Sequence, residues 1–219
     1  MVDLLAVLYS GGMDDQDKLI VSKGHAAVGL YAILAEAGIL DVEELDTYGQ
    51  DGSRLLGHVS HHVPGVELST GSLGHGLPVG CGLALARPEA RVVVLCGDGE
   101  MAEGSMWEAL LFAAHRPLTN LTLIVDANGM QGMGTVSEVL NLEPLPFKLA
   151  SFGWAVREID GHDHEAIREV LAVREAKPLA IVARTAKGKG VDFMEGQLQW
   201  HYRSPNADEL AEALRQVLA

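Results

Sequence analysis

Residues 91–99 read Arg-Val-Val-Val-Leu-Cys-Gly-Asp-Gly, an apolar run that ends in a carboxylate between two glycines. The segment Arg91–Cys96 predicts a buried strand, because β-branched side chains favour extended backbone. An apolar run without alternation is typical of a strand that is covered on both faces, as in a parallel sheet. The residues that follow, Gly97, Asp98 and Gly99, would then stand at the carboxyl end of that strand.

The same alternation of strand and helix continues along the chain. Runs that predict strands lie at 91–96, 121–126, 155–160 and 179–185, and segments that predict helices lie at 76–86, 103–115 and 163–174. A further helix is expected over 206–219 from the spacing of its apolar residues. Strands separated by helices predict an α/β fold with a doubly wound, mainly parallel sheet. We expect residues 1–219 to form one domain, since no linker-like segment divides them.

The composition narrows the classes of partner. The 219 residues contain 16 Lys and Arg against 30 Asp and Glu, a formal net charge of −14, which argues against nucleic acid or an anionic membrane as the main partner. The first residues lack the basic segment of a secretion signal, and no apolar run reaches the ~18 residues of a membrane span. Two cysteines are too few for a disulfide framework. We therefore expect a cytoplasmic protein.

Two of the predicted strands end in turns that carry oxygen ligands. Asp98 follows the first, and Asn128, 30 residues later, follows the second with Gly129 and Met130 behind it. An aspartate at such a strand end repels a phosphate unless a cation lies between them. Mg²⁺ held by Asp98, Asn128 and the Met130 carbonyl would bridge the protein to a diphosphate. Either turn alone could be an ordinary one, but the pair at neighbouring strands favours the metal site.

Motifs along most of the chain resemble those of the transketolase family, and within it those of the N-terminal subunit of the split, two-gene form. The matching stretches are Ser22–Ala26 (SKGHA), Leu56–His58 (LGH), Pro64–Glu67 (PGVE), Ser69–Gly76 (STGSLGHG), Gly97–Gly104 (GDGEMAEG), Asp126–Gly129 (DANG), Asp160–Asp163 (DGHD), Lys187–Gly190 (KGKG) and Trp200-His201. They follow the family order from about residue 2 to residue 206. The resemblance implies the diphosphate-binding module of the thiamine diphosphate-binding fold, with thiamine diphosphate and Mg²⁺ as cofactors.

The resemblance also implies a role for each matching residue. The metal ligands would be Asp98, Asn128 and Met130. The cofactor would be contacted by His25, Gly71, Ser72, Leu73, Gly99, Asn128 and His201. The catalytic group would consist of His25, His58, Glu103 and His201. Within that group, His58 would reach the reacting carbons of the sugar. Glu103 would lie at a subunit interface, beside the partner carboxylate that activates the cofactor.

The same resemblance implies an incomplete active site. Family members need a pyrimidine-binding domain, which is expected here on a partner polypeptide, the C-terminal transketolase subunit, in an α2β2 heterotetramer. Together the two subunits would transfer a two-carbon ketol unit from a ketose, or ketose phosphate, to an aldose, or aldose phosphate. Relatives also begin with a longer stretch that contains a Ser-Gly-His-Pro-Gly segment. This chain begins at the helix after it, so we expect that histidine to be missing.

Several alternatives stay open. The sugar-phosphate ligands lie on the partner, so another thiamine-dependent carboligase of biosynthetic metabolism, or a non-catalytic cofactor-binding subunit, also fits. The histidines at 58, 61 and 62 have the spacing of a helical metal site, although nearby Gly and Pro favour a loop. The small residues Gly76, Gly80 and Ala84 allow close packing, either within the chain or against another subunit, and the resemblance favours contact with another subunit. The helix from about Glu103 is expected to direct its N-terminus at the diphosphate.

Overall fold

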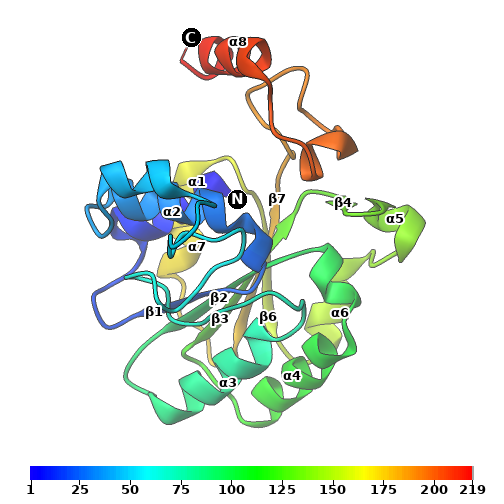
Figure 1. Cartoon of the computed structure of the whole chain (residues 1–219). Coiled ribbons are helices and arrows are strands. Elements are labelled where there is room, and N and C mark those ends of the chain that lie inside the picture. The colour runs from blue at the N-terminus through cyan, green and yellow to red at the C-terminus, as the bar shows by residue number, and fades with distance from the viewer. Residues whose placement is uncertain (219) are drawn as a thin grey trace.

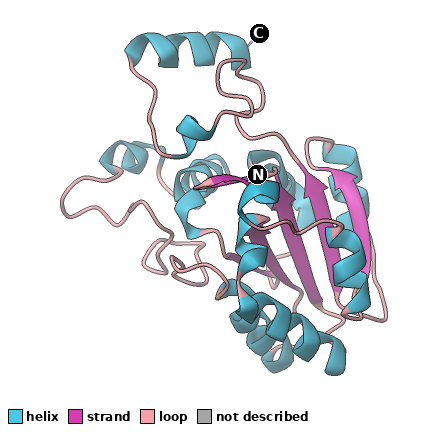
Figure 2. Ribbon diagram, turned by 90° about the vertical axis from the view of Figure 1, so that its right-hand side faces the viewer, coloured by secondary structure: helices cyan, strands magenta, loops and turns pink. Residues whose placement is uncertain are grey.

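A five-stranded parallel sheet forms the centre of the molecule (Figure 1). The computed structural model describes residues 1–218, so Ala219, the last residue of the helix expected over 206–219, lies outside the described residues. Along the sheet the strands follow the order β1 (Lys18–Val21), β2 (Val92–Gly97), β3 (Leu121–Ala127), β7 (Leu179–Arg184) and β6 (Ala155–Asp160). Figure 2 shows them side by side as a row of arrows. The predicted α/β fold with a parallel sheet is confirmed.

Helices cover both faces of the sheet (Figure 1). The α-helices of the chain are α1 (Val2–Val7), α2 (Ala27–Glu36), α3 (Gly76–Ala86), α4 (Gly104–His115), α5 (Val136–Val139), α6 (Leu145–Ser151), α7 (His164–Ala172) and α8 (Ala207–Val217), of which α8 does not cover the sheet. Two short strands, β4 (Met130–Gln131) and β5 (Gly134–Thr135), form a hairpin after β3. None of the helices within residues 1–218 is long and apolar enough to cross a membrane.

Successive residues of the strands point into two separate cores, one on each face of the sheet. On β2, Val93 and Leu95 join the core beneath α1, α2 and α7, whereas Val92 and Val94 join the core beneath α3, α4 and α6. Figure 1 shows these two groups of helices on opposite sides of the strands. Because both faces are covered, the strand has no exposed face, which explains its uninterrupted apolar sequence.

The predicted elements agree with the structure to within about two residues at most ends. Strand 155–160 and helix 76–86 have the predicted bounds, and helix 163–174 is shorter, at 164–172. The edge strand β1 was missed, because four residues of KLIV are too short to show a periodicity. Helices α2 and α6 were not predicted either. The omission of β1 matters for the site, since this strand leads directly into the Ser22–Ala26 motif.

The small-residue face of α3 packs within the chain, so the expected subunit contact through Gly76, Gly80 and Ala84 is wrong. A Cβ on Gly80 would lie 2.5 Å from Cγ2 of Val94, and one on Gly76 would lie 2.3 Å from the Ser22 hydroxyl. Ala84 is buried as well. These residues are small because the helix lies directly on the sheet. The outward face of α3 carries Gly82, which has open space around it.

Helix α8 stands apart from the sheet and its covering helices, as both Figure 1 and Figure 2 show. Asn206 caps it, and its apolar residues Leu210, Leu214 and Val217 are about half exposed or more. It contacts the preceding loop through Gln216, whose amide donates to Asp192 at 2.8 Å. The predicted C-terminal helix is confirmed for the described residues, but its apolar stripe does not join either core.

The packing of α3 gives a first testable prediction. Gly80→Ala places a methyl group against Val94, whereas Gly82→Ala adds the same methyl group in open space. Both changes gain helix propensity, worth up to about 1 kcal/mol. Overpacking at Gly80 costs about 1–3 kcal/mol, so Gly80→Ala should be less stable than Gly82→Ala by about that amount in urea unfolding. Equal stability of the two variants would contradict this packing.

Candidate cofactor and metal site

A cavity of about 240 Å³ opens at the carboxyl edge of the sheet, where β1, β2, β3 and β7 end. The residues that line it are Lys23, His25, Leu73, Gly97, Asp98, Gly99, Glu100, Asn128, Met130, Gln131, Gly132, Lys187 and His201. They come from segments far apart in the sequence. Because all strands of a parallel sheet end at the same edge, the segments that follow them are brought together there.

Asp98 and Asn128 meet in this cavity because β2 and β3 are adjacent and in register, with Gly97 opposite Asp126. Asp98 is 5% exposed, and its two oxygens accept N–H bonds from Gly99 at 2.8 Å and Gly129 at 2.6 Å. Burial raises the pKa of Asp98, and these two N–H donors partly offset the rise. The Gly129 backbone has φ +75°, a conformation that favours glycine, and this turn brings its N–H to Asp98.

The donor set fits a magnesium ion. Each Asp98 oxygen accepts one N–H bond and keeps a further lone pair, and the Asn128 amide oxygen, which accepts from the Met130 N–H at 2.9 Å, does the same. Met130 also lines the cavity. Anionic and neutral oxygens, without sulfur or imidazole among the proposed ligands, are the set that Mg²⁺ prefers.

Two lysines, Lys23 and Lys187, also line the cavity. Lys23, 6% exposed, makes a 2.6 Å ion pair with Asp126, which is 2% exposed. Burial alone would raise the pKa of Asp126, but Lys23 and the Thr185 hydroxyl lower it to about 2. Burial, and then the charge of Lys23, lower the pKa of Lys187. A chain of net charge −14 therefore presents lysines to this cavity, which fits an anionic ligand.

His25 and His201 stand together in the cavity, with ring centroids 5.5 Å apart. Although His25 is exposed at the surface, partial burial of its ring, followed by the charge of Lys23, lowers its pKa from 6.5 to about 4. Burial and then Lys187, whose ammonium donates to Nδ1 at 3.3 Å, lower the pKa of His201. Both imidazoles are thus neutral at pH 7 and can donate and accept hydrogen bonds.

Most of the residues predicted from sequence are brought together. Those that line the cavity are His25, Leu73, Asp98, Gly99, Asn128, Met130 and His201. Gly71 and Ser72 precede Leu73 and are both exposed. A Cβ on Gly71 would lie 3.9 Å from the His58 ring, so His58 stands beside this segment, outside the cavity lining.

Glu103 is not part of the cavity: it is exposed at the N-terminus of α4. The expectation that this helix directs its N-terminus at the diphosphate is wrong. A short 3-10 turn, Gly99–Ala102, follows Asp98 first, and α4 begins only at Gly104. The N–H groups nearest the cavity therefore belong to the turn at Gly99 and to Gly129 rather than to the helix.

Four lining residues were missed by sequence reasoning: Lys23, Glu100, Gln131 and Gly132. Lys23 lies in the Ser22–Ala26 motif, so the sequence carried a signal for it, but β1, the strand that precedes this motif, was not predicted. Glu100 lies inside the Gly97–Gly104 motif and is 1% exposed. Burial raises its pKa, and the Ser22 hydroxyl partly offsets the rise. Gln131 follows Met130 and packs against Gly99, where a Cβ would lie 2.8 Å from that of Gln131.

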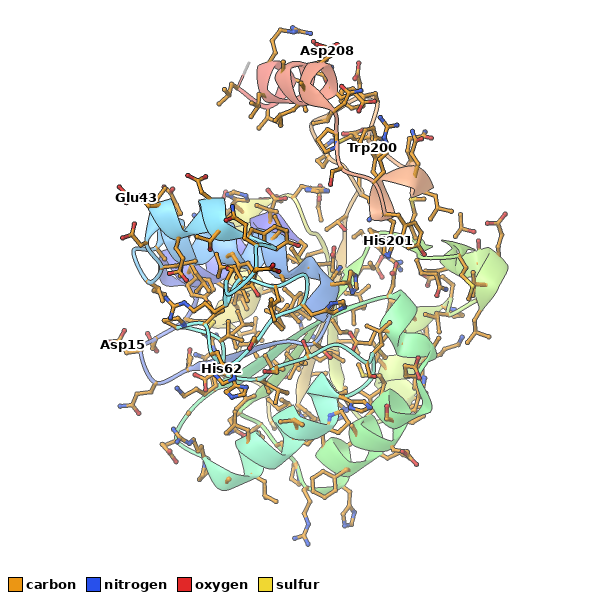
Figure 3. All side chains as sticks on the ribbon, viewed as in Figure 1. Asp15, Glu43, His62, Trp200, His201 and Asp208 are labelled. Atoms are coloured by element: carbon orange, nitrogen blue, oxygen red, sulfur yellow. The ribbon has the colours of Figure 1, made fainter. Side chains whose placement is uncertain are left out.

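The histidines of the HVSHH segment do not form a metal site in the described part of the chain. His61 and His62 stack on each other at 4.2 Å, and His61 pairs with Ser69 at 2.7 Å. Figure 3 shows His62 well away from His201. Within residues 1–218, no three His, Cys, Asp or Glu side chains are grouped to hold a metal ion.

Comparisons with known proteins agree with this geometry. Residues 11–218 match the family described as "Transketolase, thiamine diphosphate binding domain". The A subunit of the apulose-4-phosphate transketolase of Actinobacillus succinogenes is 44% identical over 210 residues, covering 93% of this chain and 76% of the relative. The 6-deoxy-6-sulfo-D-fructose transketolase subunit SqwG of a Clostridium species is 39% identical over 218 residues, covering 91% of this chain and 78% of the relative.

A solved structure shows the same fold. The crystal structure of transketolase from Campylobacter jejuni superimposes with a TM-score of 0.88 at 30% identity and covers 98% of this chain. This chain spans only 37% of the length of that protein. Fold and cavity thus define a thiamine diphosphate-binding domain. The chain belongs to the transketolase family, in which its similarity extends to proteins that are named as separate subunits.

The neutral state of His25 gives a pH prediction. Its pKa in the folded chain is about 4, so between pH 6.5 and 4 the unfolded chain takes up a proton that folded His25 does not. The free energy of unfolding should therefore fall as the pH drops through this range, and His25→Asn should reduce that fall. The comparison is best made in urea between pH 6.5 and 5, with exposed His62→Asn as the control. Identical pH profiles for wild type and His25→Asn would contradict the lowered pKa.

Proposed function

We propose that this chain is the N-terminal subunit of a split transketolase. With a partner subunit that supplies the pyrimidine-binding domain, it would transfer a two-carbon ketol unit from a ketose to an aldose. The observation that carries this proposal is the meeting of Asp98 and Asn128 with His25, His201 and Lys187 in one cavity, in a chain of this family. We further propose that residues 1–219 act as one domain in the cytoplasm. Two buried, free cysteines fit such a reducing compartment.

Three observations support the need for a partner. Two relatives with more than 40% identity are named as the A subunits of their enzymes, and the chain matches about a third of the one-chain transketolases. The cavity holds acidic, basic and imidazole groups, but the catalytic candidate Glu103 is exposed outside it, where a second subunit can reach it. The partner that we propose is the C-terminal transketolase subunit, in an α2β2 heterotetramer.

In this proposal the cofactor, thiamine diphosphate with Mg²⁺, supplies the electron sink for breaking and forming the carbon–carbon bond. Asp98, Asn128 and the Met130 carbonyl would hold the metal and through it the diphosphate. Lys187, which lines the same cavity, would add positive charge near the diphosphate. Fixing the diphosphate end in this way limits the positions that the reactive end can take, which lowers the entropic part of the barrier.

The imidazoles would handle hydroxyl groups and protons. Neutral His25 and His201 can each accept a proton at one nitrogen while the other donates, as needed when a sugar hydroxyl becomes a carbonyl oxygen. His58, beside Gly71 at the exposed rim, would contact the sugar farther out. The names of the relatives refer to a sugar phosphate and a sulfosugar, and we propose a ketose and an aldose, free or phosphorylated, for this chain.

Asp98 tests the metal site directly. Asp98→Asn keeps the shape of the side chain but removes its charge. It should weaken Mg²⁺-dependent binding of thiamine diphosphate by at least about a hundredfold, since loss of even an outer-shell partner of a metal ligand costs 10- to 100-fold. Asp208→Ala, an exposed carboxylate on α8 far from the cavity (Figure 3), is the control for charge alone. Normal affinity in Asp98→Asn, measured by calorimetry, would rule out the assigned ligand.

The activity is tested by co-purifying the chain with the pyrimidine-binding polypeptide encoded beside it. Ketol transfer from a panel of ketoses to aldoses should require both polypeptides, thiamine diphosphate and Mg²⁺. His58→Ala should raise KM for the sugar more than it changes the affinity for the cofactor, because His58 lies outside the cavity lining. A complex that binds cofactor but turns over no ketose would point to a non-catalytic subunit.

A further inference from the structure

Glu100 joins three segments that lie far apart in the sequence and border the cavity. Its Oε1 accepts a bond from the Ser22 hydroxyl at 2.5 Å and a second from the Gly74 N–H at 2.8 Å. The Ser22 hydroxyl in turn accepts the Gly76 N–H, at 3.0 Å, from the first residue of α3. Ser22 is 0% and Glu100 1% exposed, so these bonds are shielded from competing water.

Each of the three segments carries residues of the candidate site. Ser22 precedes Lys23 and His25, and Glu100 follows Asp98 and Gly99. Gly74 follows Leu73, a cavity-lining residue. One carboxylate oxygen therefore links three parts of the candidate site: the turn at Asp98 and Gly99, the Ser22–His25 segment, and residues 71–74, which form one wall of the cavity and are called the 71–74 wall.

The segment around Gly74 depends on this link for its position. Gly74 has φ +83°, and a Cβ there would lie 2.5 Å from the Ser105 hydroxyl, so the backbone is closely enclosed. Its carbonyl accepts from Ser105 at 2.8 Å and its N–H donates to Glu100. Removing the Glu100 carboxylate leaves the N–H of Gly74 buried and unpaired and releases one of the two hydrogen bonds that hold this wall.

We infer that Glu100 is a positioning residue for the cofactor. It holds the 71–74 wall and the Ser22–His25 segment at the distance from Asp98 that thiamine diphosphate requires. This inference rests on the proposed function, because the cofactor must occupy this cavity. The second oxygen of Glu100, Oε2, is buried and makes no hydrogen bond among the described residues. A direct contact between Oε2 and the ligand is the competing role, and a comparison of variants separates the two.

The test compares three variants of the chain, each co-purified with the partner subunit, by calorimetric titration with thiamine diphosphate and Mg²⁺. Glu100→Ala should raise the dissociation constant of thiamine diphosphate by about tenfold or more, from the loss of two buried hydrogen bonds. Glu100→Gln should stay near the wild-type affinity, because its amide oxygen can accept both donors while its NH₂ group replaces Oε2. Asn120→Ala is the matched control, since the Asn120 amide donates to Ala84, Arg87 and Ala90 near the start of β3, the opposite end from the cavity.

The outcomes divide cleanly. If Glu100 has only a general structural role, Glu100→Ala and Asn120→Ala should lose thermal stability alike and both should bind the cofactor normally. That result would overturn the inference. Equal loss of affinity in Glu100→Gln and Glu100→Ala also overturns it, in favour of direct contact through Oε2. If Glu100→Ala fails to fold, Ser22→Ala replaces it and should weaken binding by a smaller factor; unchanged binding then counts against positioning. Absence of binding by the wild-type chain in complex with its partner subunit contradicts the proposed function instead.

Discussion

The parallel register of β2 and β3 is the constraint on which the site depends. It places Gly97 opposite Asp126, so that the next residues, Asp98 on one strand and Asn128 beyond the other, emerge at the same edge. Apolar strands covered on both faces hold this register, because a shift of one residue would exchange the side chains of the two cores. Apart from the turn at Gly129, neither Asp98 nor Asn128 requires an unusual backbone conformation to lie at this edge.

Burial of charge at this edge has an energetic cost that the site offsets locally. Asp98, Glu100 and Asp126 are all nearly inaccessible, and only Asp126 has a cation, Lys23, in direct contact among the described side chains. Asp98 relies on two backbone N–H groups and Glu100 on a hydroxyl and one N–H. Desolvated carboxylates of this kind are costly unless they are paired. A divalent cation beside Asp98 would supply the missing charge, which agrees with a site prepared for a metal-bound diphosphate.

The sequence allowed the prediction of those parts of the fold and site whose cause is local. The valines of 91–96 predict a buried strand wherever they occur, and the glycines around Asp98 mark a close approach of backbone. The sequence could not show what the small residues of α3 pack against, since Gly76 and Gly80 allow close packing equally well against the sheet and against a second subunit. Glu100 was missed for a similar reason: a glutamate in a glycine-rich turn is usually solvated, and its burial depends on Ser22 and Gly74, which are distant in the sequence. Non-local packing, rather than residue type, decided both cases.

The most direct test of the metal-bound diphosphate site is calorimetry on the wild-type chain, co-purified with its partner subunit, with two ligands that differ only in the diphosphate. If the carboxyl edge of the sheet holds a metal-bound diphosphate, thiamine diphosphate should bind in the presence of Mg²⁺ and lose that binding when the metal is chelated. Thiamine, which lacks the diphosphate, should bind far more weakly under both conditions. Binding of thiamine and thiamine diphosphate with equal affinity, or binding that ignores Mg²⁺, would contradict the site described here.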